Sequence, residues 1–134
     1  MNLNFFMPMI PPTVTKQEHR IGYSKKNEKA YFYDSPELAD ARQKLEANLA
    51  KHIPSTPIEN APIRLMVKWL FPIKGKHKDG EYKTSKPDTD NLQKMLKDSM
   101  TRLGFWKDDA LVASEIVEKF WADIPGIYIE VTQL

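Results

Sequence analysis

The 134-residue chain contains no cysteine and only five glycines, against ten prolines. Without cysteine it has no disulfide, no thiolate zinc site and no cysteine nucleophile. It also lacks a long apolar run, because Arg64 and Lys68 interrupt the stretch 63–73, which is shorter than the roughly 20 residues of a membrane-spanning helix. The first residues lack the basic and apolar regions of a secretory signal. We therefore expect a soluble cytoplasmic protein without a membrane segment.

Charge of neither sign dominates, since 20 Lys and Arg stand against 18 Asp and Glu for a formal net charge of +2. That balance does not by itself indicate a nucleic-acid partner. The distribution is uneven, however. Segment 74–86 contains five lysines and two acids, and a second basic stretch covers 16–29. Local cation density of this kind suits a phosphate backbone, although a solvated lysine-rich turn is the more ordinary explanation.

Length and an even spread of hydrophobic residues (41%) predict a single domain over 1–134. Apolar residues at helical spacing predict one helix over 36–52, begun by Asp34-Ser35-Pro36, and a second over 90–103 that ends at Gly104. Alternating or β-branched stretches predict strands over 3–9, 30–33, 63–71, 111–121 and 127–132. We expect segment 13–29 to be a loop or an irregular ribbon, and segment 74–86 to be a mobile loop.

The order of these elements is β-β-α-β-α-β-β, without a repeating βαβ unit. This order indicates an α+β fold with a mixed sheet of about four to five strands and two helices. The prolines after the first strand favour an edge position for it, and the apolar character of both faces of 63–71 favours a central one. The turn at 123–126 predicts that the last two strands form a hairpin.

The most informative segment is Lys86-Pro87-Asp88-Thr89-Asp90-Asn91, at the start of the second helix. In extended backbone the carboxylates of Asp88 and Asp90 lie on the same side. Two anions held close together are costly unless a cation lies between them, and a hard divalent ion with oxygen ligands supplies that cation. Lys94 is one helical turn beyond Asp90 and points the same way, where an ammonium group can stabilise a phosphate or a transition-state oxygen.

A second acidic pair, Asp108-Asp109, follows the helix. If the chain returns one of these acids to the helix start, the three carboxylates form an oxygen-only metal site of the kind that hydrolyses phosphodiesters.

Ordinary structural explanations compete with this hypothesis. Asp90 with Gln93 matches a capping box, Asp88 can also cap the helix, and Asp108-Asp109 can be a simple turn. We expect Phe105 and Trp106 to pack in the core. Three histidines lack metal-ligand spacing and are expected to be structural or solvated: His19, His52 and His77.

Taken together, these motifs resemble those of the RusA-like Holliday junction resolvases. The matching residues are Lys86-Pro87-Asp88-Thr89-Asp90-Asn91, Lys94, and the run from Gly104 to Val112, which contains Asp108-Asp109-Ala110. The family's pattern is K/R-x-D-x-D-N-x-x-K, a short helix, then D-D before a small residue and a valine. The close match covers about residues 84–120, and both the spacing and the flanking residues agree.

The resemblance implies a homodimeric, metal-dependent endodeoxyribonuclease that resolves four-way DNA junctions by paired symmetric nicks, with a Mg²⁺-activated water as nucleophile. It implies Asp88, Asp90 and Asp109 as Mg²⁺ ligands (Mn²⁺ being a possible substitute) and Lys94 as a catalytic residue, with Asn91 and Asp108 in support. We expect the lysines of the basic loop to contact DNA: Lys74, Lys76, Lys78, Lys83 and Lys86.

Three other interpretations stay open. One is a nuclease of the class with P-D followed by D/E-x-K on a strand, but the matching string, Glu81-Tyr82-Lys83, precedes Pro87-Asp88 and lies in the basic loop. Another is a non-catalytic protein that binds branched DNA, or a nuclease acting on other branched DNA. The third is a structural or partner-binding protein whose aspartates only cap a helix.

Overall fold

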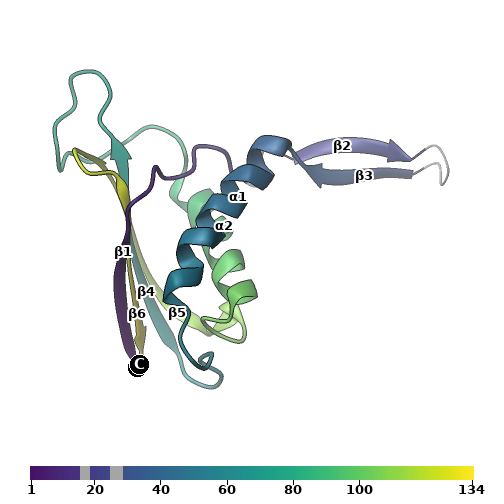
Figure 1. Cartoon of the computed structure of the whole chain (residues 1–134), viewed down its shortest axis with the longest axis vertical. Coiled ribbons are helices and arrows are strands. Elements are labelled where there is room, and N and C mark those ends of the chain that lie inside the picture. The colour runs from purple at the N-terminus through teal and green to yellow at the C-terminus, as the bar shows by residue number, and fades with distance from the viewer. Residues whose placement is uncertain (16–18, 25–28) are drawn as a thin grey trace.

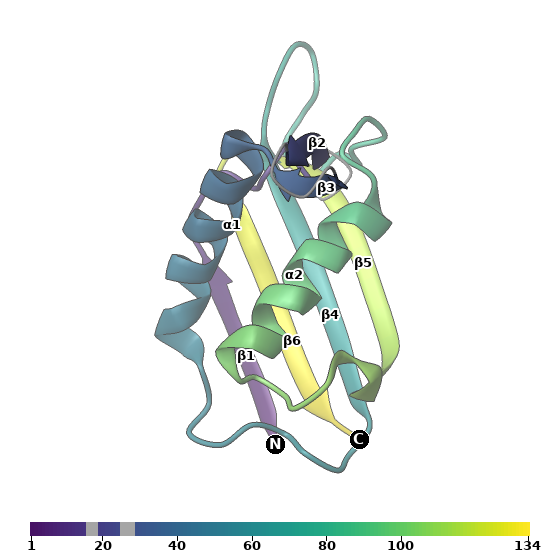
Figure 2. The same cartoon turned by 90° about the vertical axis from the view of Figure 1, so that its right-hand side faces the viewer.

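The computed structural model describes residues 1–15, 19–24 and 29–134, and of segments 19–24 and 29–34 it describes the backbone path alone. Figure 1 shows two helices on one face of a sheet, and Figure 2 shows how they cross it. The predicted α+β fold with a mixed sheet and two helices is therefore confirmed. Among the described residues, no helix is long and apolar enough to cross a membrane.

The main sheet contains β1 (Asn2–Met7), β6 (Gly126–Gln133), β4 (Ile63–Pro72) and β5 (Val112–Ala122), in that spatial order. β6 runs antiparallel to both β1 and β4, whereas β4 and β5 are parallel. The predictions of an edge position for the first strand and a central position for 63–71 are confirmed. β5 forms the opposite edge, and this position matters for the site.

Both helices begin and end where the sequence predicts. The first is α1 (Pro36–Leu49), continued by a 3-10 turn (Ala50–His52), and Ser35 Oγ accepts a hydrogen bond from Leu38 N at 3.1 Å. The second is α2 (Thr89–Leu103), which ends at Gly104 with the positive φ of 94° that glycine tolerates.

The core lies between the helices and the sheet. The buried residues of β4 alternate along the strand, and α2 packs its apolar stripe against them. Phe105 and Trp106, predicted to be core residues, are each 1% exposed. The residues of this layer are Ile63, Leu65, Val67, Trp69 and Phe71 from β4 and Leu92, Met95, Leu96 and Met100 from α2.

A polar bridge joins α1 to α2. Glu46 of α1 accepts hydrogen bonds from Ser99 Oγ at 2.8 Å and from Arg102 Nη2 at 2.8 Å. Partial burial raises the pKa of Glu46, but the hydrogen bonds from Arg102 and Ser99 outweigh it and hold that pKa below its usual value. The orientation of α2, and so of its N-terminal acids, is fixed from both sides.

Within segment 13–29, predicted to be a loop or an irregular ribbon, His19–Ser24 form a regular strand, β2, which pairs antiparallel with β3 (Lys29–Asp34). Figure 1 shows this hairpin projecting from the start of α1. The two strands form a sheet of their own, separate from the main one. Residues 16–18 and 25–28 of the predicted loop lie outside the described residues.

The predicted C-terminal hairpin is also wrong, because β4 lies between β5 and β6. The unit β4-α2-β5 is a crossover that places β5 parallel to β4 on one side. β6 then pairs with the other side of β4, so the connection 123–125 passes the end of β4 instead of closing a tight hairpin.

Candidate active site

The two carboxylates at the start of α2 are exposed, and the one at the N-cap position does not cap the helix. Asp88 occupies the N-cap position with extended backbone (φ −73°, ψ 148°), yet its side chain makes no capping hydrogen bond. Asp90 accepts from Asn91 N at 3.0 Å. The capping-box explanation fails as well, because the Gln93 side chain turns into the core and accepts from Trp69 Nε1 at 2.8 Å. Both aspartates are therefore free to take an additional ligand.

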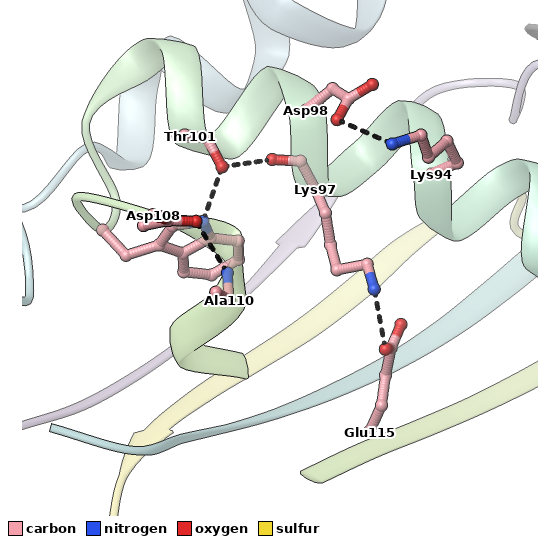
Figure 3. A network of polar contacts seen from close by, with 8 residues as sticks. Lys94, Lys97, Asp98, Thr101, Asp108, Ala110 and Glu115 are labelled. Atoms are coloured by element: carbon pink, nitrogen blue, oxygen red, sulfur yellow. Dashed lines mark hydrogen bonds and ion pairs between the residues drawn. The ribbon is translucent and has the colours of Figure 1, made fainter. Parts of the chain in front are cut away.

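Beside Asp90 lies a hollow of about 310 Å³ between α2 and β5. A polar chain crosses its floor: Gln93 Nε2 donates to Glu115 at 2.8 Å, and Lys97 Nζ donates to the same carboxylate at 2.9 Å. Figure 3 shows Lys97 reaching from α2 to Glu115 on β5. The residues lining the hollow are Thr89, Asp90, Gln93, Lys94, Lys97, Glu115 and Val117.

Lys94 also lines this hollow, and its side chain is 63% exposed. Its ammonium group lies 3.7 Å from Asp98, one turn along α2. The prediction that Lys94 points the same way as Asp90 agrees with the structure, because both residues line the hollow. A long, exposed cation beside an acidic helix start is suited to a phosphate oxygen.

The segment that delivers Asp88 is tied to β5 by a lysine that the sequence analysis did not select. Lys119 Nζ donates to Ser85 O at 2.7 Å and to Pro87 O at 2.8 Å. Lys119 lies in β5, and like Val117 and Trp121 it is at a position whose side chain is on the helix-facing side of the sheet. A lysine at a core-phase position is itself a signal that sequence reasoning could have used.

Segment 74–86, predicted to be a mobile loop, is in part paired with a strand. Gly80 N donates to Trp121 O at 2.8 Å and Lys83 N to Lys119 O at 3.0 Å, so this stretch pairs with the outer edge of β5. The His77 ring stacks on Trp121 with centroids 4.5 Å apart. Aromatic and backbone contacts to β5 compensate for the lack of apolar periodicity.

Lys83 differs from the other lysines of this loop. It is only 8% exposed, and its ammonium group lies 4.4 Å from the Trp121 ring centroid and bonds Ser85 Oγ. Burial, reinforced by the charges of Lys119 and Lys74, lowers the pKa of Lys83 below its usual value. The lysines of the loop that remain exposed are Lys74, Lys76, Lys78 and Lys86.

The acidic pair Asp108-Asp109 lies at the other end of α2. Asp108 caps a 3-10 turn (Asp109–Leu111) by accepting from Ala110 N at 2.9 Å. The 15 residues of α2 span about 22 Å at 1.5 Å per residue. Within one chain the structure therefore does not bring Asp109 beside Asp88 and Asp90, and the described residues contain no group of three or more His, Asp or Glu arranged to hold a metal.

Two histidines with described side chains are structural, as expected. His52 stacks on Phe5 with ring centroids 4.2 Å apart, and His77 stacks on Trp121 as above. The side chain of His19 lies outside the described residues.

Replacing Lys119 by methionine is expected to lower the rate of the DNA cleavage that the resemblance implies by about tenfold to a hundredfold, since Ser85 O and Pro87 O lose the ammonium that fixes the approach to Asp88. Lys119→Arg is the matched control and should recover most of the rate. Single-turnover cleavage at saturating enzyme measures the rate, and a binding titration separates it from affinity. Equal losses in the methionine and arginine variants would contradict a positioning role.

The site and fold define a class. A family model described as "Endodeoxyribonuclease RusA" matches residues 10–132, and the chain belongs to that family of endodeoxyribonucleases. Nucleases of this family are metal-dependent. Among individual proteins, the chain is similar to the "Crossover junction endodeoxyribonuclease rusA" of Lactococcus phage r1t. The two are 35% identical over 124 residues, which cover 92% of this chain and 91% of the relative.

Proposed function

We propose that the protein is a magnesium-dependent endonuclease that resolves four-way DNA junctions as a homodimer. The observation that carries the proposal is that Asp88 and Asp90 are both exposed, that the Asp88 side chain does not cap the helix, and that Asp90 lies beside the hollow that Lys94 lines. The chain belongs to the RusA family. The phage relative is named for cutting crossover junctions, which supports the same substrate class here.

The residues at the start of α2 fit a hard divalent ion. Asp88 and Asp90 offer carboxylate oxygens, the ligands that Mg²⁺ prefers, and the side chain of Asp88 has no helix-capping role to give up. Mn²⁺ is expected to substitute, since it accepts similar oxygen ligands. Bound there with Asp109, the ion would supply Lewis acidity toward the scissile phosphate and lower the pKa of a water.

The third ligand, Asp109, comes from the second subunit in this proposal. Within its own chain Asp88 precedes the N-terminal end of α2 and Asp109 follows its C-terminal end, and the helix is about 22 Å long, so the two acids do not share an ion. A two-fold dimer exchanges equivalent residues between two equivalent sites. Each site then uses Asp88, Asp90 and Lys94 from one chain and Asp109 from the other.

The protein's own groups have separate tasks. Lys94, exposed beside Asp90, neutralises the charge that develops on the phosphate oxygens. Lys119 keeps the segment before Asp88 in place through its two carbonyl contacts. Asn91 and Asp108 act in support, Asp108 by capping the turn that carries Asp109.

DNA binding rests on the exposed lysines of the loop before Asp88: Lys74, Lys76, Lys78 and Lys86. They lie next to the acids along the chain, so backbone phosphates that they contact lie close to the site of cleavage. A four-way junction has approximate two-fold symmetry, which matches two sites related by a dimer axis and predicts paired nicks.

The test is a comparison of substrates and metals. The wild-type protein is incubated with a synthetic four-way junction, linear duplex or flap DNA, in Mg²⁺, in Mn²⁺ or in EDTA. We expect paired nicks in the junction, faster by at least about tenfold than cleavage of the linear duplex, and no cleavage in EDTA, because the carboxylate site then lacks its ion. Full activity in EDTA would contradict the metal mechanism, and a preference for flaps would indicate a nuclease for other branched DNA.

A further inference from the structure

Lys83 is a buried lysine that no acid neutralises. It is only 8% exposed, and its ammonium group bonds Ser85 Oγ. The same group lies 4.4 Å from the Trp121 ring centroid and 5.2 Å from that of Phe71. Within the described part of the chain, no carboxylate forms a salt bridge with it. Lysine is rarely buried unless it is paired, because two aromatic rings and one hydroxyl compensate only in part for the water that the ammonium group loses.

Two further ammonium groups lie near that of Lys83. Lys119 donates to the carbonyl oxygen of Ser85 at 2.7 Å, and Lys83 bonds the hydroxyl of the same residue. Burial lowers the pKa of Lys83, and the charges of Lys119 and Lys74 lower it further. None of the three lysines has a carboxylate partner among the residues that the structure describes. In this lysine cluster, formed by Lys74, Lys83 and Lys119, like charges repel without a salt bridge to offset them.

The Trp121 ring beside Lys83 has an unsatisfied donor. Its indole Nε1 is buried, and among the described residues no acceptor lies within hydrogen-bond distance of it. The ring is 6% exposed and also stacks with the ring of His77. A buried N–H without an acceptor destabilises the free protein, as an unpaired ammonium group does. Cations and an N–H donor therefore lie together here, and the ligand that would satisfy them is an anion with oxygen acceptors.

The lysine cluster lies directly before the acids of the candidate active site. The Lys119 ammonium group donates to the carbonyl oxygen of Pro87 at 2.8 Å, and Pro87 directly precedes Asp88. Figure 2 shows the loop between β4 and α2 at the end of the sheet where α2 begins. A DNA strand has a phosphate at every nucleotide. A strand that places one phosphate at Asp88 therefore brings a neighbouring phosphate past the lysine cluster.

We propose that the lysine cluster is a binding subsite for a backbone phosphate of DNA, next to the phosphate that is cut. The inference rests on the proposed function, which brings a DNA strand to Asp88. Lys74 is exposed, and Lys119 uses two of its three N–H donors on backbone carbonyls, so one is available to a phosphate oxygen. Lys83 adds its charge from the buried side. A phosphate contact positions the strand and carries no sequence information.

Substitution of Lys83 by methionine separates this subsite from a structural role. Methionine keeps an unbranched side chain that packs against Trp121 but has no charge, so the free protein loses an uncompensated cation. We expect the melting temperature to rise by about 3 °C and the junction affinity, measured in EDTA at low salt, to fall about tenfold. The plot of log Kd against log salt concentration should become shallower by about 0.9, the contribution of one phosphate contact.

Two other lysine variants complete the comparison. Lys74→Met removes an exposed charge of the same cluster, so it should weaken binding by a similar factor without raising the melting temperature. The matched control is Lys51→Met, because Lys51 is exposed in the 3-10 turn that follows α1. This control should leave both the affinity and the melting temperature unchanged.

A neutral linkage in the DNA identifies the phosphate itself. In a synthetic four-way junction, one phosphate at a time near the branch point is replaced by an uncharged methylphosphonate, at symmetry-related positions, and binding is titrated in EDTA. At one position the replacement should weaken binding of the wild-type protein about tenfold and leave binding of Lys83→Met unchanged, because cation and anion form one contact. The same position should be silent in Lys74→Met.

The outcomes separate this subsite from the proposed function, since binding is measured without cleavage. Additive losses at every position, or a lower melting temperature of Lys83→Met with unchanged affinity, would overturn the subsite. A position-specific loss in a protein that does not cut junctions would support the subsite and refute the proposed function. Junction cleavage by the wild-type protein, together with wild-type affinity of Lys83→Met, would refute the subsite alone. Failure of the wild-type protein to bind junctions would refute both.

Discussion

Replacing Asp88 by asparagine is expected to slow junction cleavage by about a thousandfold, equivalent to about 4 kcal/mol of transition-state stabilisation. The carboxylate is exposed and has no capping bond to lose, so the fold should tolerate the change. Asp109→Asn should have a similar effect, although Asp109 lies at the far end of α2 in its own chain. Single-turnover cleavage of a four-way junction in Mg²⁺ measures both rates.

Binding should respond in the opposite direction. Each substitution removes a negative charge close to the DNA phosphates, so junction affinity in a gel-shift titration with EDTA should be unchanged or slightly higher. The matched control is Asp40→Asn on the exposed side of α1, where Asp40 pairs with Lys44 at 3.0 Å, and it should cut at the wild-type rate. Asn variants of Asp88 and Asp109 that cut as fast as this control would show that these acids are not ligands.

The parts of the fold that the sequence predicts are those governed by local periodicity. The alternation from Ile63 to Phe71 predicts a strand with one buried face, and the structure has that strand. The apolar stripe of α2 and the stop at Gly104 are equally local. In each case burial of one face decides the conformation, and neighbours in sequence carry the signal.

Strand pairing was less predictable because it is decided by residues far apart in sequence. The turn at 123–126 is compatible with a hairpin of β5 and β6. Instead, β5 pairs with one edge of β4 after the crossover through α2, and β6 pairs with the other edge of β4. Nothing local in β5 or β6 distinguishes the two outcomes. The same applies to the pairing of Gly80 to Lys83 with β5, which is stabilised by contacts to Trp121 and Phe120.

The site shows the same division. The motif placed Asp88, Asp90 and Lys94 together because they lie within two turns of one helix start. The motif does not predict where Asp109 lies, because about twenty residues separate it from Asp88 and Asp90. These residues include α2, which places the two ends of the segment far apart. The core-phase position of Lys119 in β5 is a sequence signal, but its role is not predictable because it depends on two backbone carbonyls, Ser85 O and Pro87 O, which carry no sequence signature.

The central claim is that each active site combines Asp88 and Asp90 of one subunit with Asp109 of the other. The direct test is a heterodimer of one Asp88→Asn chain and one Asp109→Asn chain, isolated through two different affinity tags. One of its two sites then contains both substitutions and the other contains none. The account predicts that this heterodimer nicks a single strand of the junction at about the wild-type rate per intact site, while both parent homodimers stay inactive. If all three acids of a site came from one chain, every site in the heterodimer would be damaged, and an inactive heterodimer that still binds junctions would contradict the account.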